Sequence, residues 1–150
     1  MKSTDDNAVS SEGFGALLYE TGRTWRNKLD QRLRPLGLSQ AKWVALLQLS
    51  KRGDGMTQKE LAERIGIEEP TLVGLLDRLT ADGWIERREA GHDRRCKTVH
   101  LRPKAQAVLT QITRVAAGLR AELLANINET ELHKCMEVLR KIKERAEGLR

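Results

Sequence analysis

The sequence has few cysteines and no long uncharged hydrophobic run. Its two cysteines, Cys96 and Cys135, lie far apart and do not make a disulfide framework, which agrees with a reducing compartment. No stretch approaches the roughly 18 uncharged apolar residues that cross a bilayer, and the first residues, MKSTDDNAVSSEGFG, lack the apolar core of a signal peptide. We therefore expect a cytoplasmic protein with no membrane partner.

Sequence signatures of catalysis are also missing. The chain has no glycine-rich phosphate loop, no nucleophile elbow and no pair of carboxylates framed by apolar residues. His92, Cys96 and His100 resemble metal ligands only superficially, because their spacing crosses a predicted turn and two strands, and a solvated loop explains them better. We expect neither enzymatic activity nor a cofactor or metal.

The positive charge of the chain is concentrated in one segment. Lysine and arginine total 27 against 21 aspartates and glutamates, a net charge of +6 over 150 residues. Residues 87–104 hold seven basic and two acidic side chains, whereas residues 68–82 hold one basic and four acidic side chains. A dense cationic segment indicates a polyanion partner, although a merely solvated face has the same composition.

Apolar residues recur every three or four positions over most of the chain, which predicts a mainly α-helical protein. Ser39 is a plausible N-cap, and Thr57 with Glu60 forms a capping box. The expected helices are residues 12–33, 39–50 and 57–66, a fourth with Pro70 in its first turn that ends at Gly83, and two more beyond Pro103.

The hydrophobic period changes to that of strands at residues 84–88 and 97–101. The intervening AGHDRRC, residues 90–96, reads as a loop, so the two strands form a hairpin. Four helices, a hairpin and two helices predict a winged helix-turn-helix, an α+β winged-helix fold with N- and C-terminal dimerisation helices.

Few other parts of the chain are expected to cover the apolar faces of the first and last helices. We therefore expect these helices to pack against a second copy in a homodimer. The expected organisation is a flexible arm at residues 1–11, a DNA-binding winged helix-turn-helix at 37–103, and a helical dimerisation region at 12–36 and 104–150.

Candidate DNA contacts fall on three segments: the start of the bracing helix, the outward face of the second helix, and the tip of the hairpin. They are Gln58, Lys59, Thr71, Gly74, Arg78, Asp93, Arg94, Arg95 and Lys97. Asp93 can accept from Arg95 and so aim this guanidinium into a minor groove, although a plain surface salt bridge is the alternative. Glu69 and Asp77 would repel the DNA backbone unless they accept from cytosine amino groups or orient Arg78.

Three segments resemble MarR-family transcription regulators, and most closely the SlyA branch: RLRPLGLSQAKWVALLQL, KELAERIGIEEPTLVGLLDRL and HDRRCKTVHL. The resemblance implies a homodimer on a pseudo-palindromic operator of double-stranded DNA, with a recognition helix in the major groove and a wing in the minor groove. It implies repression, activation or both. It carries Thr71 over as a recognition-helix contact, and Arg95 as the wing arginine positioned by Asp93. Gly74 and Glu69 depart from close relatives, which tend to have an arginine and a neutral amide there, so a different base readout is expected.

Many family members bind small aromatic acids between the dimer helices and the DNA-binding lobe, and Trp25, Arg26 and Trp43 occupy matching positions here. Two indoles and a guanidinium suit an aromatic carboxylate, although tryptophans on inward helix faces are also ordinary core residues.

Two other functions remain open on the sequence. Winged helices also serve as protein-interaction adaptors that bind no DNA. A redox-responsive regulator acting through Cys96 is the other alternative, because the basic neighbours of this residue favour a thiolate.

Overall fold

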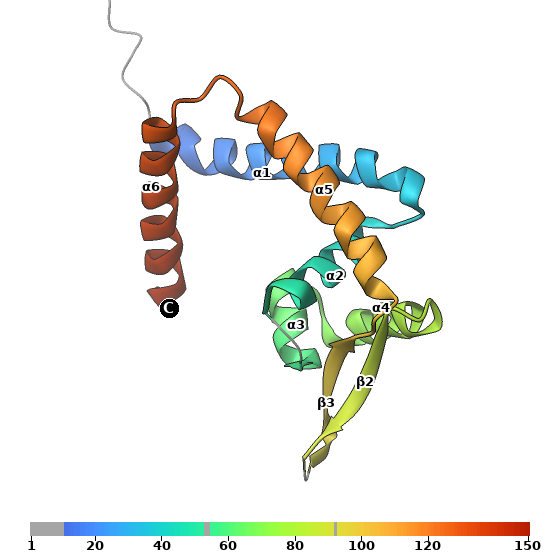
Figure 1. Ribbon diagram of the computed structural model, residues 1–150. Helices are drawn as coiled ribbons and strands as arrows, with labels where there is room; N and C mark the ends of the chain where they lie inside the picture. Colours follow the sequence, from blue (N-terminus) through green and yellow to red (C-terminus); the bar gives the residue numbers. More distant parts are fainter. Residues whose placement is uncertain (1–10, 53–54, 92) are drawn as a thin grey trace, which may run out of the picture. The chain divides into compact units, whose positions relative to one another are not determined.

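The computed structural model describes residues 11–52, 55–91 and 93–150, which form two compact units divided between Ala116 and Ala117. The helices of the first unit are α1 (Phe14–Leu33), α2 (Gln40–Arg52), α3 (Gln58–Ile65), α4 (Glu69–Ala81) and the first part of α5 (Ala105–Leu123) (Figure 1). The second unit contains the end of α5 and α6 (Glu129–Gly148). Short 3-10 turns at Ser11–Gly13 and Arg34–Leu36 flank α1. Among the described residues, no helix is long and apolar enough to span a membrane.

A small antiparallel sheet completes the first unit. Its strands are β1 (Met56–Thr57), β2 (Ile85–Ala90) and β3 (Asp93–Leu101), in the order β1-β3-β2. The hairpin of β2 and β3, here called the wing, projects away from α2, α3 and α4 (Figure 1). The predicted winged-helix fold, mainly helical with a small sheet, is confirmed.

Local signals in the sequence fix several boundaries as predicted. The Thr57 hydroxyl oxygen accepts a hydrogen bond from the backbone N–H of Glu60 at 3.1 Å, which caps α3. Gly66 ends the same helix with φ 72°, a left-handed conformation that glycine adopts without steric cost. The Ser39 hydroxyl accepts from the backbone N–H of Lys42 at 3.4 Å at the start of α2.

The predicted hairpin loop is wrong in its extent. β2 continues to Ala90 and β3 begins at Asp93, so Asp93–Cys96 belong to a strand. β1 was not predicted at all. The outer part of the wing has no core beneath it and therefore no alternation of apolar and polar residues, and a strand of two residues is too short for a period.

The core of the first unit is organised around one face of α4. Its four inward leucines, which are at most 1% exposed, are Leu72, Leu75, Leu76 and Leu79. They meet α2, α3 and β2, which all contact α4. Ala62, 3% exposed, lies in α3 where a small side chain lets the two helices of the helix-turn-helix approach. The outward face of α4 is thereby presented to solvent.

We expect Leu76→Ala to lower the free energy of unfolding by about 2–5 kcal/mol, because it leaves a cavity in a fully buried site. Val73→Ala, in the same helix but at a side chain that is 39% exposed, is the matched control and should change it by no more than about 0.5 kcal/mol. Urea unfolding followed by circular dichroism measures both. Equal losses from the two variants would contradict the assignment of faces.

Candidate nucleic-acid interface

A hollow of about 590 Å³ lies where α3, the start of α4 and the wing meet. This α3–β3 hollow is lined by Thr57, Gln58, Lys59, Glu60, Glu63, Glu69, Arg95, Cys96 and Lys97. Four of the predicted DNA contacts therefore share one surface: Gln58, Lys59, Arg95 and Lys97. The other contacts predicted on α4, Thr71, Gly74 and Arg78, lie outside this lining.

Strand β1 is what brings α3 and the wing together. Thr57, the N-cap of α3, is also the last residue of β1 and pairs with Thr98 of β3. Gln58 and Lys59 follow Thr57 directly, and Lys97 precedes Thr98. One backbone pairing thus sets the start of the bracing helix beside the basic strand of the wing.

The α3–β3 hollow contains charges of both signs. Lys59, Arg95 and Lys97 supply three cations, and the carboxylates are those of Glu60, Glu63 and Glu69. The sequence analysis missed Glu60 and Glu63 as members of this surface. The capping box places Glu60 in the first turn of its helix, and Glu63 shares its helix face, but no local signal indicates that this turn lies beside the wing, because β1 was not predicted.

One ion pair joins α4 to the wing, and a second lies within β2. Arg87 of β2 pairs with Asp77 of α4 at 2.7 Å, so Asp77 has a cationic partner within the chain. Further along β2, Arg88 Nε donates to Glu86 Oε1 at 2.8 Å, and this hydrogen bond with the attraction of the Arg88 charge holds the pKa of Glu86 below its usual value. Both acidic groups are thus already paired with wing arginines.

The outermost part of the wing is only partly described. The backbone of Asp93 pairs with Ala90, but the side chains of Asp93 and Arg94, and all of His92, lie outside the described residues. The predicted hydrogen bond between Asp93 and Arg95 therefore stays a prediction.

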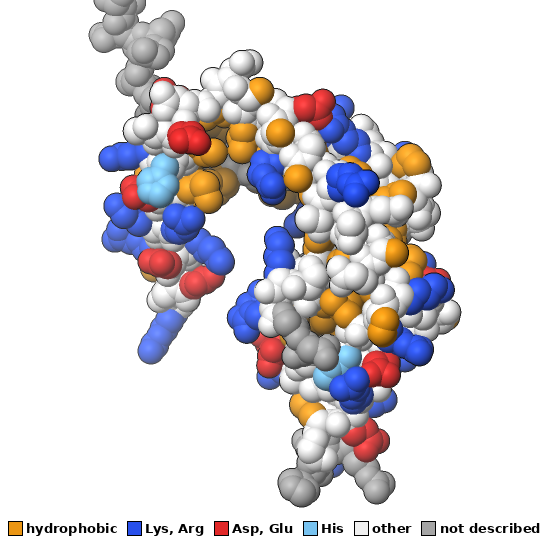
Figure 2. Space-filling view, viewed as in Figure 1, with side chains coloured by type: hydrophobic (Ala, Val, Ile, Leu, Met, Phe, Trp, Pro, Cys, Tyr) orange, Lys and Arg blue, Asp and Glu red, His pale blue; other side chains and the backbone are white. Residues whose placement is uncertain are grey.

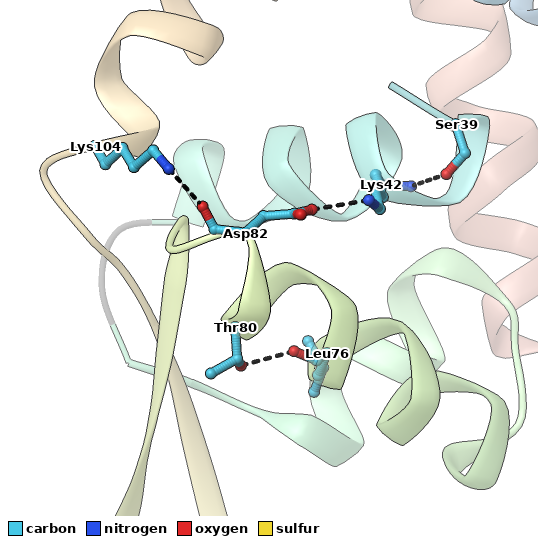
Figure 3. A network of polar contacts seen from close by, with 6 residues as sticks. All are labelled: Ser39, Lys42, Leu76, Thr80, Asp82 and Lys104. Carbon is cyan, nitrogen blue, oxygen red and sulfur yellow. Dashed lines mark hydrogen bonds and ion pairs between the residues drawn. The ribbon is translucent and has the colours of Figure 1, made fainter. Parts of the chain in front are cut away.

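Asp82, directly after α4, receives two lysines from distant segments (Figure 3). Lys42 Nζ of α2 lies 2.8 Å from Asp82 Oδ2, and Lys104 Nζ, just before α5, donates to the Asp82 backbone oxygen at 2.8 Å. The Lys42 ammonium also lies 5.8 Å from the centroid of the Trp84 ring, within reach of a cation–π interaction. These contacts hold the end of α4 against α2 and the start of α5.

The three predicted effector residues do not line one hollow in the described part of the chain. Trp43 is 4% exposed, and its indole Nε1 donates to Asp30 Oδ1 at 3.1 Å. Trp25 is half-buried in α1. Arg26 instead lines a second hollow of about 440 Å³, the α1 hollow, which also contains Leu18, Tyr19, Gly22, Arg23, Asn27 and Gln40.

A helix-turn-helix backed by a basic β-wing is a winged-helix fold, an architecture found in DNA-binding proteins. Residues 36–95 match the model of the MarR family. The solved structure of transcriptional regulator PA3341 is 44% identical, with a TM-score of 0.84, and the match covers 91% of this chain and 99% of that one. The chain therefore belongs to the MarR family and has the fold of its transcriptional regulators.

More distant structures share the same fold. Wild-type MarR from E. coli in its apo form is 26% identical, with a TM-score of 0.73 over 85% of this chain and 95% of that one. CouR from Rhodococcus jostii RHA1, solved bound to p-coumaroyl-CoA, is 20% identical, with a TM-score of 0.73 over 86% of this chain and 90% of that one. Membership of the SlyA branch stays a prediction.

We expect a double-mutant cycle of Lys42→Met and Asp82→Asn to give a coupling energy of about 1 kcal/mol, at the upper end for ion pairs, because both side chains are largely shielded, at 20% and 33% exposure. The control cycle removes Lys143 and Glu147 of α6, a pair 3.8 Å apart and more than half exposed, and should give about 0.3 kcal/mol. Urea unfolding measures both cycles. A coupling energy at Lys42 no larger than that of the control would contradict a role for this contact in holding α4.

Proposed function

We propose that this chain regulates transcription as a homodimer that binds double-stranded DNA at pseudo-palindromic promoter sites. The observation that carries the proposal is the α3–β3 hollow, which gathers cations from two segments distant in sequence beside the start of the recognition helix. Cations spaced over such a surface neutralise several phosphates at once. In this proposal residues 37–103 bind DNA, and residues 12–36 and 104–150 form the dimer.

The recognition helix α4 would enter the major groove and the wing the minor groove. Thr71 and Arg78 are exposed on α4, and Arg78 Nη1 would lie 3.9 Å from a Cβ added to Gly74, so its guanidinium lies over the glycine. Arg95 and Lys97 would contact phosphates or the minor groove from the wing, together with Arg94 and Asp93.

Exposed apolar side chains on α1 and α6 support a homodimer. Near the start of α1 they are Phe14, Leu17, Leu18 and Tyr19, and on α6 they are Met136, Val138, Leu139 and Ile142. Figure 2 shows that α6, at the left of the view, also carries many basic and acidic side chains. Apolar positions repeated along a helix with charged flanks are typical of a helix that packs against a second copy.

The α1 hollow supports a small aromatic acid as effector. Arg26 and Arg23 line it with Tyr19, whose ring centroid lies 5.6 Å from the Arg23 guanidinium carbon. Guanidinium groups bind carboxylates and a phenol ring stacks on aromatic ligands, so this chemistry fits such an acid. CouR, with the same fold, was solved with an aromatic acyl compound. We propose that Arg26 binds the carboxylate of the ligand. Trp25 lies on the same helix as Arg26. Trp43 does not contact the ligand in this proposal, because its indole donates to Asp30.

We expect Arg95→Ala to weaken binding to selected and random duplexes alike, and to reduce the slope of log affinity against log salt by about 0.9, the value for one phosphate contact. Thr71→Ala should instead change the preference among sequences. Sites are first selected from random duplex DNA with the wild-type protein, and binding is then measured by fluorescence anisotropy over a range of salt concentrations.

Lys28→Ala, an exposed cation of α1 that lines neither hollow, is the matched control and should leave the salt slope unchanged. The titration end point should give two chains per palindromic site. A monomer that binds no duplex in dilute buffer would overturn the proposal in favour of an adaptor.

We expect salicylate to quench tryptophan fluorescence and release bound DNA, and Arg26→Gln to weaken both responses at least tenfold, because a hydrogen bond to a charged group is worth about 1.5–3 kcal/mol. Lys28→Gln, on the same helix but outside the α1 hollow, should respond like the wild type. If the wild type shows neither quenching nor release, the effector part of the proposal is wrong.

A further inference from the structure

Val73 is an apolar residue that the proposed dimer does not explain. Its side chain, on α4 at the edge of the buried leucine face, is 39% exposed. All the other exposed large hydrophobic side chains of the described residues belong to α1 or to the segment 123–149, where a second copy of the chain would cover them. Val73 alone among them lies on the helix-turn-helix.

The neighbours of Val73 along α4 show which surface it belongs to. Residues four apart are adjacent on a helix, so Glu69, Val73 and Asp77 form one row. Glu69 lines the α3–β3 hollow with Arg95 of the wing, and Asp77 pairs with Arg87 of the wing at 2.7 Å. Val73 therefore lies between a residue that lines the α3–β3 hollow and a residue that pairs with the wing, on the surface proposed to face DNA.

Neither Val73 nor Glu69 has the chemistry to bind a phosphate. A valine side chain has no hydrogen-bonding group, and a carboxylate is repelled by the backbone. Both have natural partners on base edges in the major groove. The 5-methyl group of thymine is an apolar contact, and the exocyclic amino groups of cytosine and adenine are the donors that a carboxylate can accept from.

Lysine and arginine side chains in the same hollow reduce the repulsion between the Glu69 carboxylate and the DNA phosphates. Lys59, Arg95 and Lys97 line it together with Glu60, Glu63 and Glu69, so cations lie beside the carboxylates and would attract the phosphates around a base that faces Glu69. Side chains four residues apart on a helix are about 5–6 Å apart, between one and two base-pair steps of about 3.4 Å. Val73 and Glu69 can therefore face neighbouring bases.

We propose that Val73 is a specificity-determining residue that contacts the 5-methyl group of one thymine in each half-site, and that Glu69 accepts a hydrogen bond from the amino group of a neighbouring cytosine. The inference rests on the proposed function, because it requires α4 to lie in the major groove.

The test removes single methyl groups from the DNA. In a duplex selected by the wild-type protein from random sequence, each thymine pair related by the palindrome is replaced in turn by deoxyuridine. One pair of positions should weaken binding by roughly fifteenfold, or about fourfold for each methyl group, since a buried carbon is worth about 0.8 kcal/mol and a factor of ten is 1.4 kcal/mol. The other thymines outside the contact should change affinity less than twofold.

Val73→Ala should abolish this discrimination, binding the thymine and deoxyuridine duplexes with affinities within twofold of each other. Because the side chain is exposed, the variant should remain folded, and its circular dichroism and urea midpoint verify this. Discrimination that persists unchanged in Val73→Ala would overturn the assignment, as another residue would then contact the methyl group.

Glu69→Gln tests the second contact by repeating the selection from random duplexes. The amide should favour adenine at one position beside the sensitive thymine, because glutamine contacts both N6 and N7 of adenine. Glu20→Gln, an exposed carboxylate of α1 that lines neither hollow, is the control and should select the wild-type sequence. If Glu69→Gln selects the same DNA sequence as the wild type, the base contact of Glu69 is wrong. The role of this residue would then be to place a favourable negative charge at the start of the helix.

Different results would contradict the proposed DNA binding and the proposed thymine contact of Val73. Loss of all duplex binding at low salt contradicts the proposed function itself. Tight, sequence-selective binding without discrimination at any thymine contradicts only the role of Val73.

Discussion

The buried leucine face of α4 is the constraint on which the interface depends. Turning the helix by one residue would move its leucines toward water, and each buried leucine contributes about 1.5–3 kcal/mol. The helix therefore has one favourable rotation about its axis, and this rotation decides that Glu69, Thr71 and Val73 face outward. The lysines on Asp82 then fix the end of the helix against α2 and the segment before α5. Core packing thus selects the side chains that a partner meets.

The acidic residues around α4 are less unfavourable for DNA than their number suggests. Asp77 pairs with Arg87 and Asp82 with Lys42, so two of the four carboxylates between residues 68 and 82 have basic partners from other parts of the chain. Glu69, at the start of α4, also benefits from the partial positive charge of a helix N-terminus. The net charge counted over a segment of the sequence therefore overestimates how strongly that segment repels a polyanion, because some of its carboxylates form ion pairs within the folded chain.

Features that depend on local spacing could be predicted from the sequence. The capping box at Thr57, the left-handed turn at Gly66 and the inward leucines of α4 each require only residues within a few positions of one another. Features that depend on distant segments could not. The pairing of β1 with β3 joins residues 56–57 to 98–99, and the hydrogen bond from Trp43 to Asp30 engages an indole that the family resemblance suggests for ligand binding. The carboxylates of the α3–β3 hollow became visible only when that pairing set α3 beside the wing.

Because the three strands differ in length, the wing is supported by β1 at one end and extends beyond it at the other. Among the described residues, β1 pairs with β3 only at Thr98 and Val99, so the five residues from Asp93 to Lys97 extend beyond it in a two-stranded ribbon of about 17 Å. A tilt of roughly 10° at the supported end would displace the far end by about 3 Å, close to the rise of one base pair. Small rearrangements where β1 joins α3 would thus be amplified into a change of register along a duplex.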